Sequence, residues 1–297
     1  MPGPAHSEPL TLPRTTRPKV LYVMGAGRSG STILGVALGN SEGVLFAGEL
    51  DKWFAREGRP RREDARLQAF WRDVLGETGD ARDVFAARTG WLERSSGLLD
   101  PRKWRTRRRL RGRYREVSQR LFVALARTAH ATHVVDSSHY PLRARELQAL
   151  EGIELYLLWL VRDPQSVVAS LGRRDVAERH FGVVTANAYL WLTNVLSLLV
   201  FLRQPCERRL LVRHEDFVAD PRRVLSQILR LAGSPAAVAD PQSLLTGVPF
   251  HGNRLVAGEV VSLNARPDAA RHRSLPTTLV QWPWRVLFAR LAAAERG

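Results

Sequence analysis

One short segment combines glycines, hydroxyl groups and an arginine at a spacing that suits an anion. It reads Gly25-Ala26-Gly27-Arg28-Ser29-Gly30-Ser31-Thr32. The apolar stretch Lys19–Met24, which has the pattern of a strand, precedes it, and an apolar helix is expected from about Gly30. A strand, a glycine turn and a helix together present backbone N–H groups and a helix N-terminus to a bound anion. The segment therefore predicts a phosphate-binding loop.

Two familiar loops fit this segment poorly. In the nucleoside-triphosphate loop G-x-x-x-x-G-K-[ST], Gly25, Gly30 and Thr32 would match, but Ser31 stands where the lysine contacts the phosphates. The serine-hydrolase elbow G-x-S-x-G fails as well, because Ser31 also stands where its second glycine is needed. A glycine turn with no ligand remains the alternative to a phosphate loop.

A second arginine motif lies further along the chain. Arg162 directly follows the expected strand Glu154–Val161, and on a helix beginning near Pro164 the side chains of Ser170 and Arg174 would share one face. Two guanidinium groups and a hydroxyl suit a dianionic phosphate, which takes several charge-assisted hydrogen bonds. The alternative is that Arg162 pairs with a nearby carboxylate and that Ser170 only packs.

Two further residues are candidates for moving a proton. Glu49 ends an expected strand, Val44–Glu49, and His139 comes shortly after another, Thr132–Val135. α/β proteins bind their ligands at the carboxyl ends of the strands, where a carboxylate or an imidazole can act as a general base. A surface or capping role is the alternative for Glu49, and a helix-capping role is the alternative for His139.

The elements that must position these residues alternate in the manner of an α/β protein with a parallel sheet flanked by helices. A further strand is expected at Arg209–Val212, and helices are expected after Pro141, Pro164 and Pro221. Residues 52–131 show no strand pattern and predict three helices, as a helical insertion. We expect a disordered Pro-rich leader over residues 1–18 and a single domain over residues 19–297. A long loop at 247–273 would precede a closing helical segment.

These motifs together resemble a known family. Four segments, in order along the chain, are similar to motifs of the sulfotransferases that use 3′-phosphoadenosine 5′-phosphosulfate (PAPS): RSGST at 28–32, LVRDPQSVVAS at 160–170, RHEDFVADP at 213–221 and HGNR at 251–254. The third departs from the family pattern, because His214 stands where tyrosine is usual. The resemblance implies a fold similar to that of nucleotide kinases and the transfer of a sulfuryl group to a hydroxyl.

The resemblance also assigns roles to residues. It implies a loop for the 5′-phosphosulfate, a site for the 3′-phosphate and a C-terminal loop that closes over the nucleotide. Their residues would be Gly27, Arg28, Ser29, Gly30, Ser31, Thr32, Arg162, Ser170, Arg174, Gly252, Asn253 and Arg254. Glu49 would be the catalytic base, with Arg28 and His139 as further catalytic residues. Relatives often carry lysine where this chain has His139, and an imidazole is only partly charged near neutral pH.

Composition bounds the remaining possibilities. The 297 residues include 45 Lys and Arg against 29 Asp and Glu, for a net charge of +16, and a single cysteine. No apolar run is long enough for a membrane span, so we expect a cytoplasmic protein. No set of residues has metal-ligand spacing, so we expect no metal. The expected acceptor is a small molecule or a glycoconjugate. The sequence does not indicate the oligomeric state.

Two other functions remain open at this point. A kinase using ATP and magnesium is one, because Asp136 ends an apolar strand as the magnesium-holding acid of such enzymes does. A nucleic-acid-binding protein is the other, though it is less favoured. The feature that favours nucleic-acid binding is the basic run Arg102–Arg115, which contains no acidic residue. The same run could equally be a solvated helix face.

Overall fold

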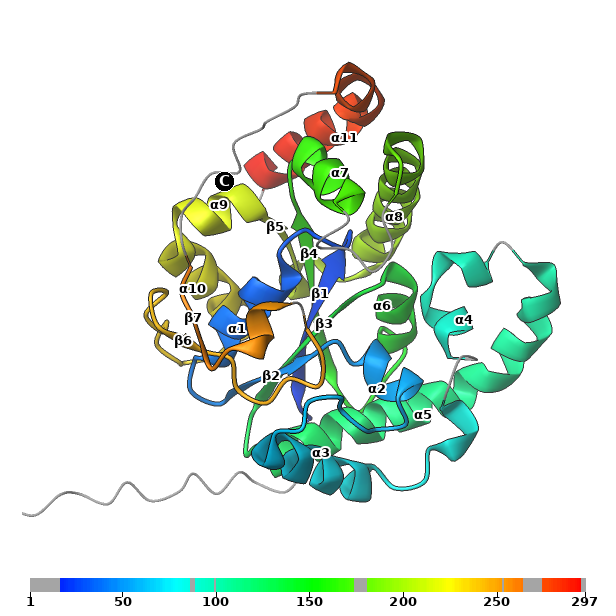
Figure 1. Cartoon of the computed structure of the whole chain (residues 1–297), viewed down its shortest axis with the longest axis vertical. Helices are drawn as coiled ribbons and strands as arrows, with labels where there is room; N and C mark the ends of the chain where they lie inside the picture. Colours follow the sequence, from blue (N-terminus) through cyan, green and yellow to red (C-terminus); the bar gives the residue numbers. More distant parts are fainter. Residues whose placement is uncertain are drawn as a thin grey trace, which may run out of the picture.

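A five-stranded parallel sheet in the order β2-β3-β1-β4-β5 forms the centre of the chain (Figure 1). The computed structural model describes residues 17–85, 89–98, 100–173, 181–252, 254–263 and 274–294. The strands are β1 Lys19–Gly25, β2 Val44–Gly48, β3 His133–His139, β4 Glu154–Val161 and β5 Arg209–Arg213. The prediction of an α/β fold with a parallel sheet flanked by helices is confirmed.

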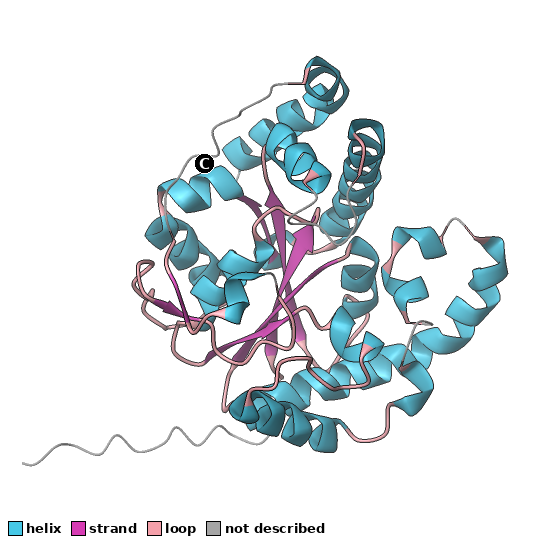
Figure 2. Ribbon diagram, viewed as in Figure 1, coloured by secondary structure: helices cyan, strands magenta, loops and turns pink. Residues whose placement is uncertain are grey.

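Helices cover both faces of the sheet (Figure 2). They are α1 Ser31–Gly39, α2 Asp51–Ala55, α3 Ala65–Thr78, α4 Gly90–Glu93, α5 Trp104–Thr128, α6 Pro141–Leu147, α7 Pro164–Gly172, α8 Val183–Arg203, α9 His214–Ala219, α10 Pro221–Leu231 and α11 Leu275–Ala294. Short 3₁₀ turns are η1 Arg82–Val84, η2 Ser95–Gly97, η3 Pro101–Lys103, η4 Cys206–Arg208 and η5 Arg254–Ala257. Two short strands, β6 Leu244–Leu245 and β7 Val260–Val261, pair antiparallel apart from the main sheet.

Alternate residues of the central strand β1 enter two separate cores, as the pleat of a strand requires. Val20, Tyr22 and Met24 pack on one face, against side chains from α3, α5, α8 and α11. Leu21 and Val23 pack on the other face, against α1, α9 and α10. All five residues are completely buried, which explains why the strand reads as one continuous apolar run.

Several elements differ from the sequence-based expectation. Strand β3 extends to His139, because Asp136, Ser137 and Ser138 continue the strand although their polarity breaks the apolar pattern. Residues 52–131 contain two long helices, α3 and α5, together with the short α2 and α4, so the expected number of three helices was wrong. The expected leader falls on residues 1–16, outside the described residues, and on the two residues before β1.

A buried cluster of charges connects this helical segment to the sheet. Arg143 in α6 is completely buried and lies between two carboxylates, 3.0 Å from Asp136 Oδ2 and 3.1 Å from Glu93 Oε1. The hydroxyl of Tyr114 in α5 donates to Glu93 Oε1 at 2.6 Å and accepts a hydrogen bond from Arg143. Asp136 Oδ1 accepts from the backbone N–H of Ser138 at 2.9 Å. Both oxygens of Asp136 are therefore engaged inside the protein.

Helix α8 is only half buried, although its sequence reads as a buried helix. Among the described residues it alone is long and apolar enough to cross a membrane, judged by length and composition, and 39% of its most apolar window is buried. A helix in the core of a soluble protein can pass the same test, so this observation is weak evidence for a span.

Candidate functional site

The parallel sheet brings four of the predicted segments to one edge. β1, β2, β3 and β4 all run in the same direction and end at Gly25, Gly48, His139 and Val161. The predicted phosphate loop, Glu49, His139 and Arg162 follow or end these strands, so they lie together at the carboxyl edge (Figure 1). Residues far apart in the sequence thus form one candidate site.

Glycine is required at two positions of the loop. Gly25 has a φ of 148°, and a Cβ placed there would lie 2.3 Å from the carbonyl oxygen of Leu160. Gly30 has a φ of 96°, and a Cβ there would lie 2.5 Å from Nδ1 of His214. A side chain at either position would therefore meet both a backbone conformation that L-residues rarely adopt and a neighbouring atom.

The start of α1 has features that suit an anion. Gly30 is the N-cap residue of α1 and has no side chain to cap the first N–H groups of this helix, and the first turn carries no acidic residue. Those N–H groups have no partner within the helix, and the helix dipole adds partial positive charge at the same place. Thr32 and Ser29 are buried beside them, and Ser31 is half buried. This geometry fits a bound phosphate or sulfate group.

The two arginines of the prediction lie close together. Arg28 has a φ of 72°, and its Nε donates to Ser170 Oγ of α7 at 3.3 Å. The Arg162 guanidinium donates to the backbone oxygen of Arg28 at 2.9 Å. Burial lowers the pKa of the Arg162 guanidinium, and the positive charge of Arg28 acts in the same direction. An anion placed beside these two positive charges would be stabilised by both.

Three other predicted site residues are less completely placed. Arg174 and Asn253 lie outside the described residues, so the expectation that Arg174 shares a helical face with Ser170 stays a prediction; α7 itself is Pro164–Gly172. The backbone of Arg254 belongs to η5. Gly252 lies against the phosphate loop, since a Cβ on it would be 3.3 Å from Cγ2 of Thr32. The C-terminal loop therefore reaches the start of α1.

Glu49 is held by two hydrogen bonds to one residue of this C-terminal loop. Its N–H donates to the carbonyl oxygen of His251 at 2.9 Å, and its Oε2 lies 3.1 Å from Nδ1 of the same residue. Burial raises the pKa of the Glu49 carboxyl, but the hydrogen bond from His251 and the charges of His139 and Lys52 outweigh it, so the pKa is lowered overall. Glu49 is therefore a carboxylate at neutral pH, as a general base must be.

His139 lies beside the glycine loop. It has a φ of 56°, and a Cβ on Gly27 would be 3.8 Å from its Nε2. Its ring stacks at a tilt on Tyr140, with the centroids 4.4 Å apart. Both predicted base candidates, Glu49 and His139, therefore border the same site.

Sequence reasoning did not assign a role to three side chains at this edge. The hydroxyl of Tyr189 in α8 accepts a hydrogen bond from the N–H of Gly27 at 3.0 Å, and no sequence signal marks it. Lys52 pairs with Asp51 at 3.0 Å, and its ammonium acts electrostatically on Glu49. His251 belongs to the segment HGNR at 251–254. The family resemblance predicted that this segment lies near the nucleotide, but it did not predict the contact between His251 and Glu49.

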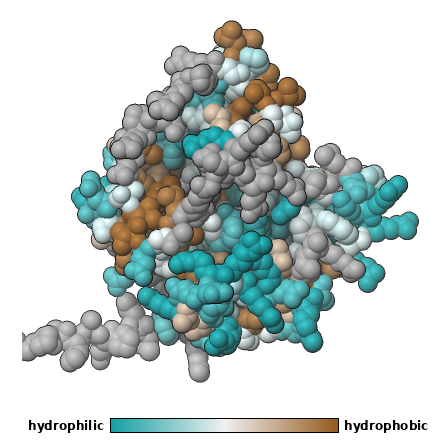
Figure 3. All heavy atoms as spheres, viewed as in Figure 1, coloured by the Kyte–Doolittle hydropathy of each residue, from teal (hydrophilic) through white to brown (hydrophobic). Residues whose placement is uncertain are grey.

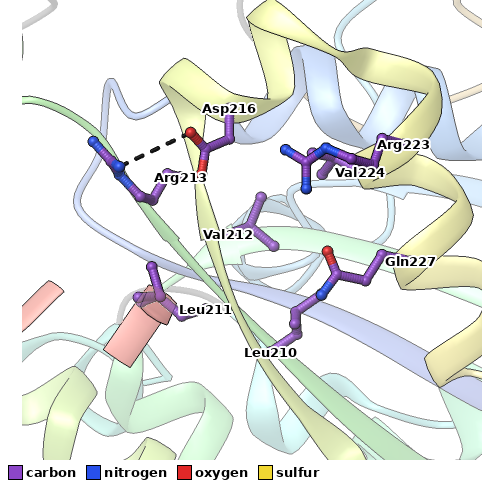
Figure 4. Close-up of a pocket in the computed structure, with 9 residues that line it drawn as sticks. Leu210, Leu211, Val212, Arg213, Asp216, Arg223, Val224 and Gln227 are labelled. Atoms are coloured by element: carbon purple, nitrogen blue, oxygen red, sulfur yellow. Dashed lines mark ion pairs between the residues drawn. The ribbon is translucent and has the colours of Figure 1, made fainter. Parts of the chain in front are cut away.

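A small pocket lies elsewhere in the fold (Figure 4). Its volume is about 30 Å³, and it lies beside β5, with Asp216 turned toward Arg213 at 3.9 Å. Its other lining residues are Leu210, Leu211, Val212, Arg223, Val224, Gln227 and Ala292. None of the predicted site residues lines it, so it is not the candidate site.

His214 should make stability depend on pH. It packs under Gly30, and burial, followed by the charge of Arg162, lowers its pKa to about 4. Between about pH 6.5 and pH 4 the unfolded chain binds a proton at this position that the folded chain does not. We therefore expect the folded state to lose stability, on the order of 2 kcal/mol from this group, as the pH falls through that window.

The measurement is the melting temperature at pH 7 and pH 5. The difference between these two temperatures should shrink in His214→Gln, which cannot be protonated. It should stay at the wild-type value in His130→Gln, because His130 is exposed. An equal acid-induced fall in wild type and His214→Gln would contradict the assignment.

With this geometry established, comparison with known proteins identifies the family. A family model described as the sulfotransferase family matches residues 20–238. The chain belongs to the sulfotransferase family. The match spans the phosphate loop, Glu49, His139 and the Arg162 motif, in the order in which the sequence presents them. No curated protein sequence matches this sulfotransferase at a significant level.

Solved sulfotransferase structures are similar to this chain at low sequence identity. The sulfotransferase domain of the Synechococcus PCC 7002 olefin synthase superposes with a TM-score of 0.53 and 19% identity, over 92% of this chain and 97% of that one. The sulfotransferase domain from the curacin biosynthetic pathway has a TM-score of 0.48 and 18% identity, over 94% and 98%. Sulfotransferase STF1 from Mycobacterium tuberculosis H37Rv has a TM-score of 0.47 and 15% identity, over 74% of this chain and 68% of that one. At 19% identity, the first supports the P-loop-like fold of this sulfotransferase and nothing finer.

Proposed function

We propose that this sulfotransferase moves a sulfuryl group from PAPS to a hydroxyl of a small-molecule or glycoconjugate acceptor. The observation that carries the proposal is the carboxyl edge of the sheet. There, a helix start with a glycine N-cap and two arginines lie at the same edge of the sheet as the Glu49 carboxylate, which follows β2 and is held by His251. The helix start and the arginines suit an anionic donor, and the carboxylate can itself accept a proton. The proposal treats residues 19–297 as one domain, with residues 52–131 as a helical insertion.

The charge of the donor supports this assignment. The phosphosulfate and the 3′-phosphate of PAPS carry about four negative charges in all. Arg28, the loop N–H groups and the start of α1 can bind the 5′ end, while Arg162 and Ser170 suit the 3′-phosphate. Gly252, Asn253 and Arg254 would close over the nucleotide.

The reaction needs one proton transfer and one substitution at sulfur. Glu49 accepts the proton of the acceptor hydroxyl while the acceptor oxygen bonds to sulfur. The bond between sulfur and the bridging oxygen breaks, and adenosine 3′,5′-bisphosphate (PAP) leaves with the negative charge. Arg28 and the loop N–H groups stabilise the charge that grows on that oxygen. Lys52 and His139, when protonated, add positive charge beside the transferred group.

The two alternative functions receive less support. Asp136, the feature that favoured a kinase, has both oxygens engaged by Ser138 and Arg143 in the protein interior. In the basic run, Arg111 and Arg115 both pair with Glu146, and Arg113 pairs with Asp83. These three arginines therefore connect α5 to α6 and η1 inside the protein, which gives them a structural role that does not require nucleic acid.

A comparison of nucleotides in a melting experiment tests the proposal. PAP should raise the melting temperature by several degrees at concentrations well above its Kd, because a ligand that binds only the folded state stabilises it. ATP with magnesium should raise it less, and EDTA should change neither the PAP effect nor turnover of PAPS. Stronger stabilisation by ATP with magnesium, or loss of turnover on chelation, would contradict the proposal.

The two arginines should contribute to different kinetic constants. Arg28→Ala should reduce kcat by roughly 10²–10³ with a smaller effect on PAP affinity, because Arg28 meets charge that grows in the transition state. Arg162→Ala should mainly weaken PAP and PAPS binding, because the 3′-phosphate does not react. Calorimetric titration with PAP and steady-state kinetics separate the two constants. Equal effects of both substitutions on both constants would refute this division of roles.

His251 should set the pH range in which Glu49 works. Its hydrogen bond helps hold the pKa of Glu49 below the ordinary value against the effect of burial. In His251→Leu, burial should raise that pKa, so the acidic limb of the rate profile should move to higher pH. His251→Asn, whose side-chain N–H can still reach Glu49, should move it less. An unchanged profile in His251→Leu would show that His251 does not act through Glu49.

A further inference from the structure

Helix α8 buries several polar side chains and exposes several apolar ones. Four polar side chains of α8 are buried: Asn187, Thr193, Asn194 and Ser197. Leucines point outward along the same helix, with Leu199 52% and Leu202 55% exposed. A surface helix of a globular protein normally shows the opposite arrangement. The outward face of α8 therefore has the composition of a contact surface.

Helix α11 continues this apolar surface. Its inward face consists of residues spaced one turn apart, among them Gln281, Trp284 and Phe288. Its outward face carries Leu275, Leu279 and Trp282, which are 76%, 75% and 62% exposed. The exposed three recur at helical spacing, so they form a stripe along one side of the helix.

The two helices adjoin one another. The indole N–H of Trp191 in α8 donates to the carbonyl oxygen of Val280 in α11 at 2.8 Å, and its ring lies 5.1 Å from that of Trp284. Apolar residues gather over α11 and α8 at the top of the view in Figure 3. We name this region the α8–α11 surface; it consists of Leu192, Leu199, Leu202, Leu275, Leu279, Val280 and Trp282. Contiguous exposed apolar patches of this kind mark sites of interaction.

The charges around the surface indicate what it binds. Neither α8 nor α11 contains an acidic residue, and their three arginines, Arg203, Arg285 and Arg290, are all exposed. The whole chain carries a net charge of +16. A second copy of the chain would bring an equally positive surface with no carboxylate on these helices to pair with the arginines. An anionic bilayer offers both apolar depth for leucine and tryptophan and negative charge for arginine.

We infer that the α8–α11 surface docks this sulfotransferase on an anionic membrane surface. The outward leucines and Trp282 enter the boundary between headgroups and acyl chains. The arginines remain among the anionic headgroups. The helices lie on the bilayer and do not cross it, because their inward faces pack in the protein core.

Co-sedimentation with lipid vesicles tests the inference directly. The wild-type chain should bind vesicles of phosphatidylcholine and phosphatidylglycerol at a ratio of about 3:1 at least tenfold more tightly than vesicles of phosphatidylcholine alone. Part of this binding should persist in 0.5 M salt, because the apolar contribution is not screened. Failure of the wild-type chain to bind the anionic vesicles would overturn the inference without recourse to any variant.

Variants locate the binding surface. The triple variant Leu199→Ser, Leu279→Ser, Trp282→Ser should lose at least tenfold in vesicle affinity. The matched control is Leu245→Ser with Val260→Ser, which removes two similarly exposed apolar residues, 63% and 56% exposed, from β6 and β7 and should bind as wild type does. If the triple variant does not fold, Leu202→Ser with Leu275→Ser replaces it.

Two results with these variants would overturn the inference. One is equal loss of vesicle binding in Arg105→Gln, Arg108→Gln, Arg109→Gln, which would place the binding on α5. The other is a wild-type dimer in light scattering that the triple variant converts to a monomer, which would show that a second copy covers the surface. Far-UV circular dichroism and the melting temperature verify that each variant is folded.

Discussion

Glu49→Gln should reduce turnover by roughly 10²–10⁴, the usual effect of removing a general base. Glutamine keeps the shape of the side chain and can still hydrogen-bond to His251, but it cannot accept a proton from the acceptor. Binding of PAP should hardly change, because the carboxylate belongs to the acceptor side of the reaction. Steady-state kinetics with PAPS and calorimetry with PAP measure the two effects separately.

The choice of acceptor decides how sharp this test is. A phenol of low pKa ionises easily and could conceal the need for a base, so an aliphatic alcohol is the stricter acceptor. Because the pKa of Glu49 lies below its ordinary value, the wild-type rate should be flat above about pH 6.

His139 is the competing base. An imidazole with an ordinary pKa would instead give a rise in rate centred near pH 6.5. Near-normal turnover in Glu49→Gln, together with loss of turnover in His139→Ala, would assign the base to His139.

Arg143→Met should destabilise the fold by roughly 3–5 kcal/mol, because it removes one partner of a buried ion pair. Asp136 and Glu93 would then remain in the protein interior without a cation. The pKa of Glu93 is already raised to about 7, mainly by burial, in spite of the opposing charge of Arg143. Since domains are commonly stable by only about 5–15 kcal/mol, we expect a large loss of soluble protein and a melting temperature roughly 5–10 degrees lower.

A matched control and a rescue complete this test. Arg113→Ala removes a surface arginine that pairs with Asp83 and should cost less than about 1 kcal/mol. Adding Asp136→Asn and Glu93→Gln to Arg143→Met should restore part of the lost stability, because no unpaired charge then stays buried. A melting temperature of Arg143→Met within one degree of wild type would show that the cluster is not important for stability.

The parts of this fold that could be predicted are those whose signal is local. β1 and β4 are continuous apolar runs, and the glycine loop between β1 and α1 carries its own backbone requirements at Gly25 and Gly30. Glu49 and His139 could be placed at the site because parallel strands end at one edge of a sheet. β3 was underestimated because Asp136, Ser137 and Ser138 are buried polar residues, and a pattern of apolar residues stops at the first of them.

The sequence by itself determined the type of fold and the glycine loop between β1 and α1, and it predicted the edge of the sheet where a site would lie. Only the tertiary structure decided that His251 holds Glu49, that Tyr189 supports Gly27 and that Asp136 pairs with Arg143. His251 and Glu49 are 202 residues apart, and Tyr189 and Gly27 are 162 apart. Such contacts depend on how strands and helices pack, and no periodicity records them. The outward apolar face of α8 was hidden for the same reason, because hydrophobicity alone does not tell which side of a helix meets the core.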